Sequence, residues 1–151
     1  MDYQTVKQYM DDEQGLLDLI DNYKPTFEKI EELSKHMREK HITSATQGEQ
    51  LLQELNGVYG SLLPISNALE TEAKNKEERE YQLIKTKAIA AGEKFVDAAT
   101  KHAAANTAAE YKSVASWFGA YAEICKVQIG SCQSLLNSLR DEKYAASQHS
   151  Q

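Results

Sequence analysis

The chain has few of the residues that interrupt helices, and it has no long apolar run. Its 151 residues include only two prolines and seven glycines, and Val, Ile and Thr are sparse beside Ala, Leu, Glu, Lys and Gln. Helix propensity therefore dominates along the whole sequence, and no strand is expected. No apolar stretch approaches the roughly 18 to 20 residues that a membrane-spanning helix needs, so we expect no membrane partner.

Cysteine is also scarce. The two cysteines, Cys125 and Cys132, lie seven residues apart on one expected helix. This spacing is a rise of about 10 Å, which is too long for a disulfide within that helix. We interpret both as reduced core thiols. The first residues lack the basic and apolar regions of a secretory signal, so we expect a cytoplasmic protein.

No motif in the sequence indicates an enzyme or a metal site. The four histidines include no pair three or four residues apart, the spacing that places two metal ligands on one helix face. Neither a glycine-rich phosphate loop nor a serine or cysteine nucleophile motif occurs. The acidic runs at 11–13 and 77–80 are typical of solvated helix faces, because acid–base catalysis needs a pocket that shifts pKa values. We expect no catalysis, no metal, no cofactor and no small-molecule substrate.

Charge is distributed unevenly along the chain, whose net charge is −6. Residues 1–80 contain 17 acids and 9 bases, whereas residues 81–151 contain 6 acids and 8 bases. Such asymmetry indicates either that the two halves attract each other or that the second half meets an anionic partner.

The spacing of apolar residues predicts an all-α fold: a helical bundle or hairpin with one long C-terminal coiled-coil helix. Proline or glycine marks three of the expected helix boundaries, at Pro25, Pro64 and Gly92. The expected helices cover residues 3–23, 25–41, 51–63, 66–91 and 93–143. The first two should bury one face each, made of Val6, Met10, Leu16, Leu17, Ile20, Phe27, Ile30, Leu33 and Met37.

The same reading predicts three consecutive segments within one folded unit. Residues 1–63 form acidic N-terminal helices, residues 64–144 form a long helical hairpin or coiled-coil region, and residues 145–151 form a frayed polar tail.

A heptad pattern from Val114 to Leu139 predicts a packing seam on the last helix. The pattern does not extend further back, where Val96, Ala99 and Ala103 are expected to form a separate stripe. Its partner is either another part of this chain or a second copy. The seam and its aromatic flank comprise Val114, Trp117, Phe118, Tyr121, Cys125, Cys132, Leu135 and Leu139, with Gln128 as a polar member.

Lysines form a second pattern, which begins before Gly92 and continues along the last expected helix. Lys87, Lys94 and Lys101 are spaced seven residues apart, and Lys112 points in nearly the same direction. A basic stripe that faces away from the seam is suited to a phosphate backbone. Together with Lys85, these lysines are our candidate nucleic-acid contacts. The alternative is that they are solvated or paired with the acidic N-terminal half.

The C-terminal half resembles small all-helical bacteriophage proteins, nearest the UvsY-type recombination mediators. The resemblance covers roughly 65 residues, from Glu77-Glu-Arg-Glu-Tyr81 through Lys85-Thr-Lys87-Ala to Ser134-Leu-Leu-Asn-Ser-Leu-Arg-Asp-Glu142, and includes Trp117-Phe-Gly-Ala-Tyr-Ala-Glu-Ile-Cys125. It implies a ring-like homo-oligomer in a phage-infected bacterial cell, with single-stranded DNA and a recombinase or single-strand-binding protein as partners.

Two functional hypotheses follow. The first is a non-enzymatic, oligomerising helical protein of phage type, an accessory or mediator in DNA recombination or replication. The second is a helical adaptor, scaffold or inhibitor that binds a partner protein and has no nucleic-acid role.

Overall fold

The structure is a computed structural model, and it describes residues 1, 3–39 and 42–148. Over these residues the protein is all-α, as the sequence predicts, and no strand occurs in the described chain. The helices are α1 (Tyr3–Tyr9), α2 (Glu13–Glu39), α3 (Ala45–Ala90), α4 (Asp97–Thr107) and α5 (Ala109–Gln148).

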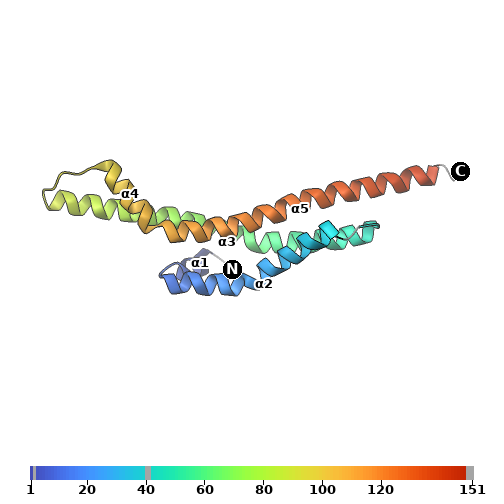
Figure 1. Cartoon of the computed structure of the whole chain (residues 1–151), viewed down its shortest axis with the longest axis horizontal. Coiled ribbons are helices and arrows are strands. Elements are labelled where there is room, and N and C mark those ends of the chain that lie inside the picture. The colour runs from blue at the N-terminus through green and yellow to red at the C-terminus, as the bar shows by residue number, and fades with distance from the viewer. Residues whose placement is uncertain (2, 40–41, 149–151) are drawn as a thin grey trace. The chain divides into compact units, whose positions relative to one another are not determined.

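The helices form two compact units, and three of them contribute to both. Unit 1 comprises Met1–Ile20 and Pro64–Gly119, and unit 2 comprises Asp21–Leu63 and Ala120–Gln151. Unit 1 therefore contains α1 and α4 whole, together with the first part of α2, the second part of α3 and the first part of α5. Figure 1 shows these helices and the fold of α4 back beside the end of α3.

The expected helix boundary at Pro25 is wrong, because α2 continues through this residue. The chain breaks earlier, at residues 10–12, where the Gly15 N–H donates to Asp12 Oδ1 at 2.7 Å and caps α2. An internal proline costs about 3 kcal/mol, whereas each buried Leu, Ile or Phe contributes about 1.5 to 3 kcal/mol. The buried face runs in phase across the proline and consists of Leu16, Leu19, Phe27, Ile30 and Leu33.

The expected apolar face of α2 needs two corrections. Leu17 is 55% exposed, while Leu19, which we did not expect in the core, is fully buried. Leu16 and Leu17 are consecutive and point about 100° apart around the helix, and Leu16 takes the inner position.

The expected boundary at Pro64 is wrong for the same physical reason. α3 runs through it for 46 residues. Its buried positions repeat with heptad spacing on both sides of the proline, so packing holds the helix together despite the missing N–H donor. These positions are Leu51, Leu55, Leu62, Ile65, Leu69 and Glu72.

The predicted break at Gly92 is confirmed. Gly92 has a positive φ of 67°, Glu93 N–H donates to Ala88 O at 3.0 Å, and Gly92 N–H donates to Ile89 O at 3.1 Å. This is the Schellman ending of a helix, which favours glycine. The single helix expected from 93 to 143 is wrong, because residues 93–96 are not helical and Ala108 separates α4 from α5.

The packing seam of α4 and α5 is longer than predicted and lies on a rotated face. It begins before Val114, because Thr100 and Ala104 are buried, while Val96, Ala99 and Ala103 are exposed. Small residues fill many seam positions and allow close helix approach. The buried heptad series on these helices is Ala104, Ala108, Tyr111, Ala115, Phe118, Ala122, Cys125, Cys132 and Leu136.

The predicted seam shares only Phe118, Cys125 and Cys132 with this series. Trp117 is 43% exposed. The other predicted members are partly buried: Val114, Tyr121, Gln128, Leu135 and Leu139. α5 stays helical to Gln148 rather than fraying from Ala145, and residues 149–151 lie outside the described chain.

Unit 2 has a core in which α2, α3 and α5 meet. Leu33, Leu55 and Leu136 pack there with Cys132, whose thiol lies 3.3 Å from the Gly48 carbonyl oxygen. Ion pairs border this core, with Lys29 Nζ 2.9 Å from Glu54 Oε2 and Arg140 3.0 Å from Glu49.

Candidate interaction surfaces

The first candidate surface comprises the last turns of α3 and its connection to α4, residues 83–96, which we call the basic turn. It contains Lys85, Lys87 and Lys94 against one acid, Glu93. Among the described residues, no carboxylate forms an ion pair with any of these three lysines. The basic turn therefore presents uncompensated positive charge.

Polar and aromatic contacts fix the two ends of the basic turn. The Tyr81 hydroxyl donates to Asp97 Oδ1 at 2.7 Å, and Lys101 Nζ lies 2.8 Å from Asp97 Oδ2. The Lys101 contact and then the Tyr81 hydrogen bond lower the pKa of the Asp97 carboxyl. Phe95 packs edge-on to Tyr81 with ring centroids 6.3 Å apart, and Lys85 Nζ lies 5.8 Å from the Phe95 centroid. These contacts tie the start of α4 to α3.

We predicted that the lysines form one continuous stripe, and this prediction is wrong. Lys85 and Lys87 lie on α3, Lys94 lies in the connection, Lys101 lies on α4 and Lys112 lies on α5. The break at residues 91–96 separates them. Lys101 and Lys112 are ion-paired, with Asp97 and Glu77 respectively, so their charges are compensated inside the chain.

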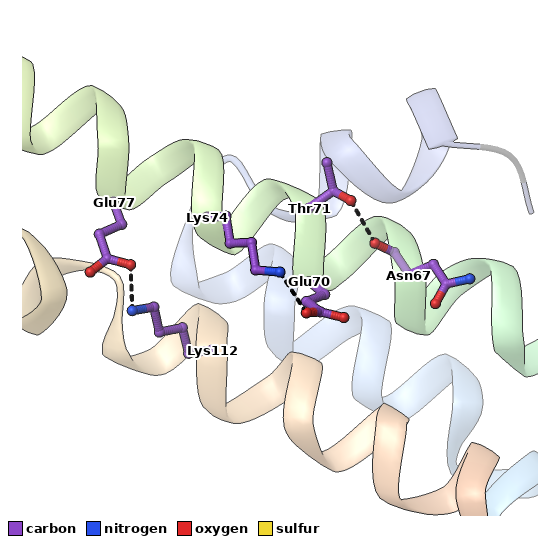
Figure 2. Close-up of polar contacts among 6 residues, drawn as sticks. All are labelled: Asn67, Glu70, Thr71, Lys74, Glu77 and Lys112. Carbon is purple, nitrogen blue, oxygen red and sulfur yellow. Dashed lines mark hydrogen bonds and ion pairs between the residues drawn. The ribbon is translucent and has the colours of Figure 1, made fainter.

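Figure 2 shows the α3–α5 face of unit 1, where one of these pairs lies. Lys112 on α5 reaches Glu77 on α3, and Lys74 Nζ lies 2.7 Å from Glu70 Oε1 on the same helix. Lys76 Nζ lies 3.9 Å from the centroid of the Tyr111 ring. This face is occupied by contacts within the chain.

Large aliphatic side chains accompany the lysines of the basic turn. Ile89 is 63% exposed, Val96 is 50% exposed and Leu83 is 46% exposed. The basic turn is thus both cationic and apolar.

The second candidate surface is a groove in unit 1 between the start of α2 and the start of α5, which we call the α2–α5 groove. Leu17 and Ile20 contribute its apolar lining from α2, and Val114 contributes from α5. Glu13 and Glu110 are both exposed and line the same groove. Leu16, Ala109 and Ser113 complete the lining.

A third surface lies in unit 2, between α2 and α5. Gln128 donates through Nε2 to Ser34 Oγ, while its Oε1 is buried and has no hydrogen-bond partner among the described residues. Met37 and Ile124 line the hollow beside it, and Ile124 is 42% exposed. A buried acceptor without a donor is unfavourable.

A buried carboxylate connects α1 to α3 in unit 1. Glu72 is 3% exposed and accepts hydrogen bonds from the Tyr3 hydroxyl and, at 3.1 Å, from Asn75 Nδ2. Arg79 lies 3.7 Å away. Burial opposes ionisation of Glu72, but these hydrogen bonds and the charges of Lys7 and Arg79 outweigh it and lower the pKa. The contact is structural, since it holds the seven-residue α1 in place.

Neither cysteine lies on an accessible surface. Cys125 and Cys132 are fully buried and free, and burial raises the pKa of both thiols. In the described part of the chain, no group of three or more His, Cys, Asp or Glu residues is placed to hold a metal ion.

Comparisons of the chain with protein-family models, curated proteins and solved structures found no match. None of the helices within residues 3–39 and 42–148 is long and apolar enough to cross a membrane.

Our sequence-based candidates included Val114 of the α2–α5 groove, but not the other residues that line it or the apolar part of the basic turn. We placed Leu17 in a core and assigned no role to Ile89. A signal for Leu17 existed, because Leu16 rather than Leu17 is in phase with Phe27 and Ile30 on α2. Nothing comparable marked Ile89, whose exposure depends on where α3 ends.

Proposed function

We propose that this chain is a non-enzymatic helical protein that works by oligomerising, as an accessory or mediator in DNA recombination or replication. The observation that carries the proposal is the set of aliphatic side chains left exposed beside two well-formed cores. Leu17 and Ile89 are each more than half exposed. A folded monomer gains nothing from this exposure, whereas an assembly buries it.

Two observations support the nucleic-acid part of the proposal. The C-terminal half resembles UvsY-type phage mediators, which act on single-stranded DNA with a recombinase. Lys85, Lys87 and Lys94 form no ion pairs within the described chain and are available for phosphate groups. The partners proposed are a second copy of this chain, single-stranded DNA, and a recombinase or single-strand-binding protein.

Light scattering over a range of protein concentrations tests the assembly. We expect a mass of two or more chains, and a monomer at all concentrations would contradict the proposal. Fluorescence anisotropy with a labelled single-stranded oligonucleotide at low salt then tests DNA binding.

The DNA test compares Lys85→Glu with the control Lys126→Glu. Lys126 is exposed and lies 3.4 Å from Glu123 on α5, outside the basic turn. We expect Lys85→Glu to weaken DNA binding about tenfold and the control to have little effect. Absence of binding at low salt would remove the DNA part and leave the assembly part standing.

A helical adaptor for a partner protein is the second candidate function. The hollow beside Gln128 in unit 2 favours it, because the exposed side chain of Ile124 offers apolar surface there. This candidate predicts that Ile124→Asp abolishes capture of the partner, while Lys85→Glu has no effect.

A further inference from the structure

We propose that the basic turn of one copy docks into the α2–α5 groove of a second copy. This inference rests on the proposed function, because it names the interface through which the chain would assemble. Both surfaces belong to unit 1.

The basic turn offers a compact, cationic and apolar element. Ile89 and Val96 are at least half exposed, and three lysines surround them along residues 83–96. Gly92 closes α3, and the Tyr81–Asp97 hydrogen bond holds the start of α4 against it. A turn fixed in this way loses little conformational freedom when it docks.

The α2–α5 groove offers the complementary chemistry. Leu17 is 55% exposed and lines the groove with Ile20 and Val114, so apolar side chains meet apolar lining. Glu13 and Glu110 face the same groove and form no ion pair within the described residues. Residues 1–20, which form one wall of the groove, contain five acids and one base.

The charges favour two different surfaces in contact rather than two like surfaces. A contact between two basic turns would bring six lysines together, and a contact between two grooves would oppose their glutamates. Docking of the basic turn in the α2–α5 groove pairs lysine with glutamate and buries the aliphatic side chains of both surfaces. Figure 1 shows the α3–α4 connection apart from the start of α2, so one copy does not fill its own groove.

The exposed aliphatic side chains favour protein as the occupant of the part of the basic turn that carries Ile89 and Val96, which leaves Lys85 to the DNA contact of the proposed function. Non-specific DNA binding relies on exposed aromatic rings that stack on bases. Here the exposed groups are aliphatic, while the nearest ring, Phe95, is partly buried against Tyr81. A heterologous contact of this kind uses each surface once per copy and therefore extends into a ring or a filament.

The test is a mixing experiment with two variants, followed by light scattering. Leu17→Asp disables the groove, and Ile89→Asp disables the turn. We expect each variant alone to associate at least about tenfold more weakly than the native chain. An equimolar mixture should form a 1:1 complex and stop there, since one working turn and one working groove remain.

Val127→Asp is the matched control, because Val127 is 59% exposed but lies in unit 2. It should assemble like the native chain, and circular dichroism should show native helicity for every variant. If Leu17→Asp and Ile89→Asp assemble normally while the native chain is oligomeric, this interface is wrong and the proposed function stands. If the native chain is monomeric, the proposed function fails as well.

Exchange of charges between the two surfaces is an independent test of the same contact. It remains informative if either aspartate variant fails to fold. Lys87→Glu/Lys94→Glu should assemble weakly, and adding Glu13→Lys/Glu110→Lys in the same chain should restore assembly. If the lysine variant instead assembles normally but loses binding to a single-stranded oligonucleotide, the basic turn serves nucleic acid and the inference is overturned.

Discussion

Glu72 occupies a heptad position of α3 at which the spacing would otherwise place an apolar side chain. Its ionised form is stabilised by hydrogen bonds from the Tyr3 hydroxyl and Asn75 and by the charges of Lys7 and Arg79. Because the native pKa is lowered, the stabilisation is fully present above the pKa of a carboxyl in the unfolded chain, about 4.3, and is lost as pH falls through the lower native value.

We therefore expect Glu72→Gln to reduce the free energy of unfolding by about 1 to 2 kcal/mol at pH 7. The difference from the native protein should shrink as pH falls below about 4. Urea unfolding at a series of pH values measures both quantities. Glu28→Gln, at an exposed position of α2, is the control, and an equal effect of the two variants would contradict the role of Glu72.

Tyr3 gives a second prediction at this scale, because its hydroxyl donates to Glu72 from a helix of seven residues. A helix this short is unstable without tertiary contacts. In Tyr3→Phe we expect faster amide hydrogen exchange in α1, with α5 unchanged. Tyr144→Phe should leave exchange in α1 as it is, since Tyr144 is 74% exposed near the end of α5. Unchanged exchange of α1 in Tyr3→Phe would show that Val6 and Met10 alone secure it.

At the scale of the helices, two glycines provide an opposed pair of predictions. A Cβ added at Gly15 would lie 2.3 Å from the Tyr9 carbonyl oxygen, whereas one at Gly57 would meet nothing within 4 Å. We expect Gly15→Ala to destabilise the protein by about 1 to 3 kcal/mol, because backbone must move. Gly57→Ala should stabilise α3 by about 0.5 to 1 kcal/mol through helix propensity. Thermal unfolding distinguishes the two, and the same sign for both would contradict the packing at Gly15.

The helices also show how far the sequence could predict this fold. The all-α class and the break at Gly92 followed from propensity and from the one glycine whose conformation requires it. The continuation of α2 through Pro25 and of α3 through Pro64 was not predicted, because we considered each proline without the apolar residues around it. The in-phase apolar residues on both sides of each proline, visible in the sequence, would have shown that burial outweighs one lost hydrogen bond.

The seam on α5 was only partly predictable from the sequence. We favoured larger side chains at Val114 and Tyr121, but the core takes Ala115 and Ala122 instead. Close helix approach selects small residues, and a count of large apolar groups does not detect them. The surfaces of unit 1 were harder still, because they depend on which helices meet, and a single sequence does not specify that.

At the scale of the whole molecule, α2, α3 and α5 each contribute to both units, and this sharing bears on cooperativity. Local opening of one unit would require α5 to end between Gly119 and Ala120, where hydrogen bonds continue along its backbone. That cost favours unfolding of both units in one transition. The chain carries a separate probe in each unit, since Trp117 is its single tryptophan and lies in unit 1, while both cysteines lie in unit 2.

We expect Trp117 fluorescence and the reactivity of the cysteine thiols to report the same urea midpoint. Burial of Cys125 and Cys132 and their raised pKa values should make a thiol reagent react about a thousandfold more slowly with the native chain than with the unfolded one. Cys125→Ala/Cys132→Ala is the blank for the thiol signal. Thiol exposure at a lower urea concentration than the fluorescence change would show that unit 2 opens alone, and that the shared helices do not couple the two units.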